Sequence, residues 1–273
     1  MQIISLLIII FYFFTAICYF FYLIYQNKFF SKISFFSLII SFFLHSLYIA
    51  GQTFIHNNFP VINFTQSLTF FSWLITCSYL YILLKYRLQV LGVFLVPLSL
   101  ILFLTGTISP ERNIIKALPF FENFSFWLPI HATLCFAGNA AFAVASCLGI
   151  IFLIQEKYIK SKKIGAFHRF LPSLGILDEL NYKCLIIGFP LLTLGIMSGA
   201  IWAQYTMGNY WQWDPKETWS LVTWFFYAVL LHGRLNMGWR GNKQAVLSII
   251  GFIVILFTFL GVNFLHDSYH AWG

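Results

Sequence analysis

Charged residues are scarce in this chain, and acidic residues are the scarcer kind. Only 9% of the 273 residues are charged, with 8 acidic and 16 basic ones, whereas a soluble domain carries about 25%. The composition therefore excludes an ordinary soluble domain. The net charge of +8 would suit nucleic-acid binding if the basic residues lined one face. They are scattered between long uncharged apolar runs instead, so no nucleic-acid partner is expected and membrane topology explains the charge better.

Cysteine pairs of the Cys-x-x-Cys type are absent from the sequence. Free cysteine is among the most buried residue types and behaves as a small hydrophobic residue. We therefore expect no thiol redox chemistry from this chain itself. The five cysteines all lie within expected membrane spans or at their ends: Cys18, Cys77, Cys135, Cys147 and Cys184.

Long apolar runs are abundant, since hydrophobic residues make up 60% of the sequence. A spanning helix needs roughly 20 apolar residues, and runs that are apolar on every face favour helices over the alternating strands of a membrane barrel. We therefore predict one all-α, polytopic membrane domain over residues 1–273. The connection before the sixth span is predicted to hold a short amphipathic helix at the membrane interface, within 171–180. Eight transmembrane helices are expected at about 3–25, 33–55, 66–85, 89–107, 130–155, 184–203, 216–233 and 245–265.

The positions of the basic residues indicate the orientation. If the connections alternate sides, all but three of the 16 basic residues fall on one side, the exceptions being Arg112, Lys116 and Lys216. By the positive-inside rule, the more basic side faces the cytoplasm or its organellar equivalent, and both termini lie outside. The first apolar run is too long for a removable signal peptide and lacks a basic n-region, so we expect it to be a genuine span.

The most unusual outward segment is 202–219, which reads Trp-Ala-Gln-Tyr-Thr-Met-Gly-Asn-Tyr-Trp-Gln-Trp-Asp-Pro-Lys-Glu-Thr-Trp. Tryptophans at a membrane boundary commonly form an interfacial aromatic belt. A belt explains this segment poorly, because it gives no reason for several aromatic residues to be packed into one loop. We interpret the segment as a preorganised binding surface. Its tryptophans are Trp202, Trp211, Trp213 and Trp219.

The residues that follow the loop read as the start of a helix. Asp214 suits the N-cap, Pro215 suits the first helical position, and Glu217 completes an arrangement like a capping box. The two acids therefore have a purely structural explanation as well as a binding one. In either case, the joint would hold the tryptophans rigidly against the seventh span.

Flat aromatic faces just outside a bilayer suit a large planar apolar ligand, of which heme is the obvious candidate. Heme iron needs axial ligands, usually histidine. His131 opens the fifth span and His270 follows the eighth, both on the side of the tryptophan segment. Each alone is explained as an interfacial histidine, but two on different helices can approach a porphyrin from opposite faces. His45, in the middle of the second span, could line a path for heme; a single hydrogen bond to a neighbouring helix is the interpretation we favour.

These motifs resemble the tryptophan-rich WWD signature of heme-handling membrane proteins. The version Trp213-Asp-Pro-Lys-Glu-Thr-Trp219 is similar to the CcsA (ResC) type of cytochrome c biogenesis protein, from the system II pathway. The resemblance covers essentially the whole chain and is strongest over 184–273. Met207 stands where the family usually has tryptophan. Further matches are Trp127-Leu-Pro-Ile-His131, Leu231-His232-Gly-Arg234, and Gly261-Val-Asn-Phe-Leu265 leading to His270.

The resemblance implies a membrane subunit of a heme ligase, or cytochrome c synthase. Such a subunit exports or presents heme b on the extracytoplasmic side and promotes its thioether attachment to the Cys-x-x-Cys-His motif of apocytochrome c. His131 and His270 are then the axial ligands of an external heme iron, and His232 is the ligand of an inner one. No general base is indicated. The residues implied to form the heme-binding surface are Trp202, Trp211, Trp213, Asp214 and Trp219.

The position of His232 in the sequence also suggests a functional role, independently of the resemblance. It lies near the inner end of the seventh span, where an ionisable side chain is costly and a functional role is the default hypothesis. A place at the headgroup boundary beside Arg234 is the alternative. The resemblance further implies a CcsB (ResB)-type membrane partner with its own histidine, and a location in the inner (cytoplasmic) membrane, or the thylakoid membrane in a plastid. A transporter that delivers heme without ligating it is the alternative function.

Overall fold

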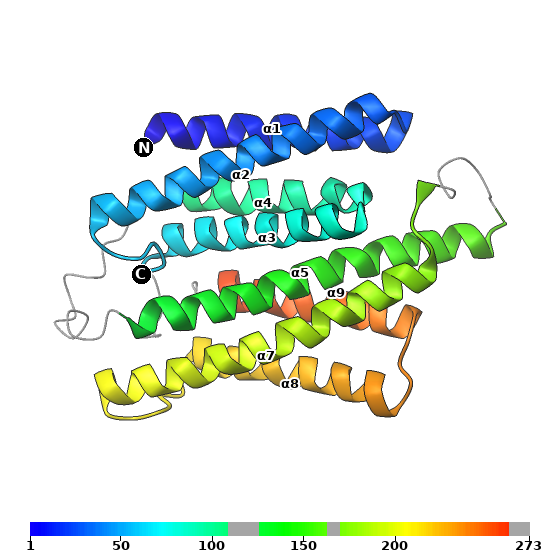
Figure 1. Cartoon of the computed structure of the whole chain (residues 1–273). Coiled ribbons are helices and arrows are strands. Elements are labelled where there is room, and N and C mark those ends of the chain that lie inside the picture. Colours follow the sequence, from blue (N-terminus) through cyan, green and yellow to red (C-terminus); the bar gives the residue numbers. More distant parts are fainter. Residues whose placement is uncertain (109–125, 163–169, 262–273) are drawn as a thin grey trace. The chain divides into compact units, whose positions relative to one another are not determined.

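The computed structural model describes residues 1–108, 126–162 and 170–261. Within these ranges the chain forms eight α-helices, and none of the described residues lies in a strand, which confirms the prediction of an all-α polytopic membrane protein (Figure 1). The helices are α1 (Gln2–Tyr25), α2 (Lys28–His56), α3 (Phe64–Tyr86), α4 (Gly92–Ile108), α5 (Trp127–Lys160), α7 (Leu174–Met207), α8 (Pro215–Asn236) and α9 (Asn242–Leu256).

Seven of the described helices are long and apolar enough to cross a membrane. The first turn of α4 is preceded by a short 3₁₀ helix, η1 (Gln89–Leu91), and α9 passes into a π-helical turn, η4 (Phe257–Gly261). The remaining described helix, α8, is less apolar than these seven. Its ends carry Lys216, Glu217 and Arg234, and its middle reads Trp224-Phe-Phe-Tyr227.

The amphipathic interface helix predicted within 171–180 is wrong. α7 begins at Leu174 and continues without a break to Met207. The charged residues of this stretch have partners within the fold, because Asp178 pairs with Arg234 of α8 and Glu179 pairs with Lys183 one turn further along. A helix whose charges are paired in this way can extend past the apolar run that the sequence shows.

Two compact units divide the chain, Met1–Glu111 (unit 1) and Arg112–Gly273 (unit 2). Unit 1 contains α1 to α4 around a core that includes buried polar side chains. The Tyr12 hydroxyl lies 3.0 Å from His45 Nδ1 and 2.9 Å from Thr76 Oγ1, which in turn bonds Ser99 Oγ at 3.1 Å. Interhelical bonds of this kind hold helices together in lipid. The favoured interpretation of His45, a hydrogen bond to a neighbouring helix, is therefore confirmed.

Unit 2 is built around α5, which packs against both α7 and α9. The backbones approach closely where glycine faces the neighbouring helix. A Cβ at Gly138 would lie 2.9 Å from the Gly188 carbonyl oxygen on α7, and one at Gly149 would lie 2.7 Å from the Ala245 carbonyl oxygen on α9. The Gly138–Gly188 approach lies within the long contact of α5 with α7 that is visible in Figure 1.

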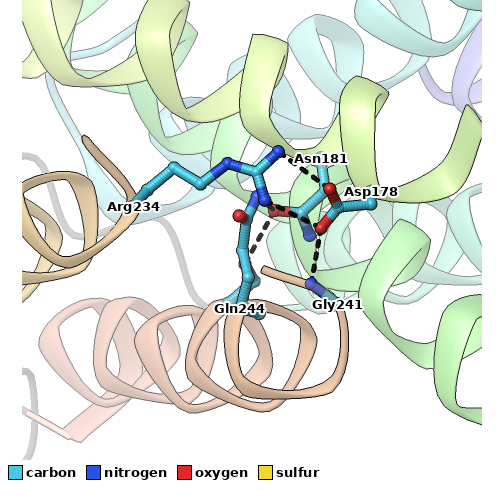
Figure 2. Close-up of polar contacts among 6 residues, drawn as sticks. Asp178, Asn181, Arg234, Gly241 and Gln244 are labelled. Atoms are coloured by element: carbon cyan, nitrogen blue, oxygen red, sulfur yellow. Dashed lines mark hydrogen bonds and ion pairs between the residues drawn. The ribbon is translucent and has the colours of Figure 1, made fainter. Parts of the chain in front are cut away.

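At one end of unit 2, polar contacts link α7, α8 and α9 (Figure 2). The residues that make them are named here the Asp178 cluster: Asp178, Asn181, Arg234, Gly241 and Gln244. Arg234 Nη1 and Nη2 donate to the two Asp178 oxygens at 3.0 and 2.8 Å, and the Gly241 backbone N–H donates to Asp178 Oδ1 at 2.7 Å. Asn181 donates to the Ala145 carbonyl at 2.7 Å and accepts from Gln244 Nε2 at 2.8 Å. Side chains from α7, α8 and α9 therefore fix this end of the unit.

Candidate functional site

The start of α8 has the cap that the sequence predicts. Asp214 is the N-cap, its Oδ2 accepts from the Lys216 backbone N–H at 3.0 Å, and Pro215 stands in the first turn. Glu217 differs from the expected capping box, because its Oε2 accepts from the backbone N–H of Gln212 at 2.8 Å. The carboxylate therefore ties the helix to the loop before it, two residues upstream of the N-cap. This holds the loop more directly than the predicted contact would.

The tryptophan loop, residues 208–214, joins α7 to α8. It begins at Gly208, which closes α7 in the left-handed region with φ of 77°. Trp213 also has a positive φ, 57°, a backbone conformation that is costly for a bulky residue. The rings of Trp211 and Trp213 lie 6.3 Å apart and nearly perpendicular, at 80°. Trp213 is 75% exposed, so the strained residue presents its ring outward.

The structure does not bring all four predicted tryptophans to one exposed face. Trp202 is buried in α7, whereas Trp211 is half-buried in the loop. Trp219 packs edge-on against Phe257, with ring centroids 4.6 Å apart. Trp213 is the predicted tryptophan with the largest exposure, and Tyr210 next to it is 63% exposed.

His131 lies in the first turns of α5, half-buried against α7. Its Nδ1 is 2.7 Å from the carbonyl oxygen of Gly195. Because a carbonyl can only accept, Nδ1 carries a proton, and in the neutral ring Nε2 keeps its electron pair. This is the arrangement typical of a metal-binding histidine, whose second nitrogen donates to a carbonyl or carboxylate. None of the described residues forms a hydrogen bond with Nε2.

Three further features near His131 were missed by the sequence reasoning. A Cβ at Gly199 would lie 2.6 Å from the Nδ1 and Cε1 atoms of the ring, so the imidazole packs directly on the α7 backbone. Cys135 Sγ, one turn along α5, is 3.8 Å from Nδ1. Lys216, at the start of α8, is close enough to interact electrostatically with His131. The Gly-x-x-x-Gly spacing of Gly195 and Gly199 was the available signal for close helix packing.

His232 lies on the exposed side of α8. Its Nδ1 is 3.0 Å from the side-chain nitrogen of Asn236, one turn along the helix, so in this arrangement Nδ1 accepts the bond. A 180° rotation of the amide would exchange the roles, presenting an oxygen to Nδ1. His232 and Asn236 continue an exposed stripe of α8 at intervals of three and four residues, namely Val222, Phe225 and Val229.

His270 lies outside the described residues, so its predicted place beside the tryptophan loop stays a prediction. The remaining predicted site residues that the structure describes divide into two groups. His131 interacts electrostatically with Lys216, which lies two residues after Asp214 at the start of α8. His232 lies on the last turns of α8, two residues before Arg234 of the Asp178 cluster.

Comparison with known proteins gives a consistent result. The family model described as "Cytochrome C assembly protein" matches residues 61–270. The chain is similar to the cytochrome c biogenesis protein CcsA of Chlamydomonas reinhardtii, with 39% identity over 222 residues, or 79% of this chain and 61% of that protein. It is also similar to CcsA of Guillardia theta, with 35% identity over 231 residues, or 79% of this chain and 77% of that protein.

CcsA of Mesostigma viride is 33% identical over 262 residues, covering 86% of this chain and 84% of that protein. Among solved structures, the chain has the fold of a protein named Cytochrome c Heme Lyase CcmF. The TM-score is 0.66 at 17% sequence identity, and the match covers 95% of this chain and 46% of that one.

Proposed function

The chain belongs to the cytochrome c assembly protein family, and from this premise we propose that it is the membrane subunit of a heme ligase for c-type cytochromes. Its substrates would be heme b and an apocytochrome c with a Cys-x-x-Cys-His motif. The heme supplies vinyl groups, and each cysteine S–H adds across one vinyl C=C to give a thioether, with no leaving group. The part of this chain is to bind, orient and shield the heme while the thiols react.

The arrangement of His131 carries the proposal. The Gly195 carbonyl holds a proton on Nδ1, so that in the neutral ring Nε2 has the electron pair that a heme iron requires. The histidine is half-buried at the end of unit 2 where the start of α8 approaches it. We propose that His131 is one axial ligand of an external heme and that His270 is the other.

The tryptophan loop would form the surface on which the porphyrin rests. Trp213 and Tyr210 offer exposed rings, and Glu217 anchors the loop backbone through Gln212. The indole N–H of Trp211 is buried and makes no hydrogen bond to any described residue. A heme propionate is an acceptor of the kind that this donor needs. Met207 and Trp202 would contribute apolar contact from the last turns of α7.

His232 would serve a second, inner heme site together with a partner chain. A histidine and an amide on an exposed helix face within the membrane are costly to leave against lipid. The exposed stripe that carries His232 has the spacing of a face that packs against another helix. A CcsB (ResB)-type membrane protein is the partner we propose, with a histidine of its own opposite His232.

The proposed orientation places the tryptophan loop outside. The Asp178 cluster and the basic residues around it then lie on the cytoplasmic side, as the positive-inside rule requires. The membrane would be the inner (cytoplasmic) membrane, or the thylakoid membrane of a plastid.

The first test is the absorption spectrum of the full chain, purified in detergent after coexpression with its proposed partner. Wild type is compared with His131→Ala and His270→Ala, and with His56→Ala as a control on an exposed histidine of α2. We expect a bis-histidine heme spectrum that both site substitutions weaken or shift and the control leaves unchanged. No heme in wild type, or three variants with identical spectra, would contradict the external site.

The second test separates a ligase from a transporter that only delivers heme. The chain, its partner and an apocytochrome c are coexpressed in cells without another cytochrome c synthase. Covalent heme on the apocytochrome, detected by heme staining after denaturing electrophoresis, supports ligation. Heme that reaches the outer side and stays non-covalent supports delivery alone.

A further inference from the structure

The imidazole of His131 sits on a stretch of α7 that has no side chains. We infer that Gly195 and Gly199 position His131 as an Nε2 ligand: the Gly195 carbonyl fixes the proton on Nδ1, and the bare backbone at Gly199 gives the ring its place. That this geometry serves to present Nε2 to a heme iron rests on the proposed function. The geometry itself can be tested without heme.

The Gly195 carbonyl determines which nitrogen of the ring is available. A neutral imidazole has one donor and one acceptor nitrogen, and a carbonyl oxygen can engage only the donor. The distance of 2.7 Å between Nδ1 and the oxygen is that of a short hydrogen bond. The bond therefore selects the Nδ1–H tautomer and points the other nitrogen away from the carbonyl.

Gly199 determines where the ring lies. An alanine methyl group at this position would be 2.6 Å from both Nδ1 and Cε1 of His131, closer than any real carbon contact. The obstructing atoms belong to the His131 side chain, so the ring would have to leave its place on α7. Because the ring is held there by its Nδ1–H bond, its displacement would also break the contact with Gly195.

Gly195 itself is a less informative position for substitution. A Cβ there would lie 2.9 Å from the Cys135 backbone nitrogen as well as close to Cys135 Sγ. Relief of a backbone contact requires α5 and α7 to separate, which would disturb the whole interface. Gly199→Ala is therefore the variant that displaces the histidine without forcing the helices apart.

Cys135 is the competing partner for Nδ1. Its sulfur is 3.8 Å away, at the outer limit of a weak sulfur hydrogen bond, whereas the Gly195 oxygen is at 2.7 Å. The thiol therefore adds little to the choice of tautomer. Removal of the thiol in Cys135→Ala should leave the His131 proton on Nδ1.

A matched control exists on the same helix and the same interface. A Cβ at Gly188 would lie 2.6 Å from Cε1 of Phe142 on α5, a ring contact as close as that of Gly199 with His131, and 3.0 Å from the Gly138 carbonyl oxygen. Gly188→Ala therefore strains the packing of α5 against α7 at least as much as Gly199→Ala does, without a close contact to His131. Any general effect of tighter helix packing should appear in both variants.

The test in the absence of heme uses the full chain with ¹⁵N-labelled histidine, in lipid bilayers, observed by solid-state NMR. The His131 signals are identified by their loss in His131→Gln. We expect Nδ1–H in wild type, Gly188→Ala and Cys135→Ala, and a mixture of tautomers in Gly199→Ala. A neutral His131 ring with its proton on Nε2 in wild type, or the same His131 signals in Gly199→Ala as in wild type, would overturn the inference.

The test with heme measures bound heme per chain by the pyridine hemochrome assay, in the complex with the partner. Gly199→Ala should lose at least fivefold of the heme that depends on His131, and Gly188→Ala should retain it. Equal retention by the two variants would overturn the positioning role. If wild type itself carries no heme, the proposed function fails, and the NMR result still decides whether the two glycines position the ring.

Discussion

The two histidines of unit 2 are held by different parts of the polypeptide. His131 donates to a backbone carbonyl and packs on a glycine, so the main chain of α7 fixes it. His232 pairs with the Asn236 amide on its own helix, two residues from an ion pair between side chains. A carbonyl within a helix cannot rotate, whereas an amide can turn by 180° and exchange donor for acceptor. The first histidine is therefore set for one role, and the second can be switched by its surroundings.

The same contrast extends to the two ends of unit 2. The end with the Asp178 cluster depends on charged and amide side chains that link α7, α8 and α9 (Figure 2). The other end depends on a close backbone approach and on a capped helix start. Substitutions of charged and amide side chains should therefore be felt most at the first end.

The largest effect is expected from Asp178→Ala. It leaves Arg234 without its largely buried carboxylate partner and the Gly241 N–H without its acceptor. Loss of one member of a buried pair costs about 3–5 kcal/mol. We expect the free energy of unfolding, measured by reversible SDS titration, to fall by about 3 kcal/mol. Glu179→Ala is the control, because its pair with Lys183 is exposed and should cost less than about 0.5 kcal/mol. Similar losses in the two variants would contradict the comparison.

Asn181→Ala should have the next largest effect. Asn181 bonds Ala145, Gln244 and Ser248, on two neighbouring helices. Interhelical bonds in membrane proteins contribute about 0.6 kcal/mol each on average, so the three together predict a loss of about 2 kcal/mol. The same SDS titration measures it. A double variant with Gln244→Ala should lose less than the sum of the two single variants, because they share a bond.

Asp214→Ala should cost about 1 kcal/mol, the usual value of an N-cap. Asp214 caps α8 through the Lys216 N–H. Asp214→Asn retains a capping oxygen and should keep most of the stability. Retained stability in the asparagine variant together with a weakened heme spectrum would show that the charge of Asp214 has a binding role in addition to its structural one.

The smallest effect on stability is expected at Asn236, which is exposed. Asn236→Leu and Asn236→Asp should each change the free energy of unfolding by less than about 0.5 kcal/mol. They should differ in the proton position on His232, however, since a carboxylate accepts only and selects Nδ1–H. ¹⁵N NMR of labelled histidine measures this directly. An unchanged His232 signal in Asn236→Asp would remove the contrast with His131.

The helices could be predicted from the sequence because lipid imposes one rule on every span. An apolar run of about 20 residues must satisfy its backbone internally, so it becomes a helix. The cap at Asp214 was equally local, since it depends on neighbouring residues alone. The failure at 171–180 has the opposite origin. Whether α7 continues through Asp178 depends on Arg234, which lies 56 residues further along the chain.

The residue types of the candidate site could be predicted from the sequence. The contacts that hold those residues in place could not. The histidine and the tryptophans stand out by composition, as does the proline after Asp214. Nothing near His131 in the sequence indicates that its partner is the carbonyl of Gly195, because every residue has a carbonyl. The positive φ of Trp213 was also hidden, as was the hydrogen bond from the Gln212 backbone to Glu217 beside it.

The modest apolarity of α8 bears on how the chain enters the membrane during synthesis. An arginine opposes insertion of an isolated helix by up to about 3 kcal/mol at its centre, and by less toward its ends. α7 is synthesised before α8, so Asp178 is available to pair with Arg234 as soon as Arg234 leaves the ribosome. α8 can then partition into lipid together with α7 as a helical hairpin, in which Asp178 neutralises the charge of Arg234. We therefore expect the ion pair to favour insertion of α8 as well as to stabilise the folded protein.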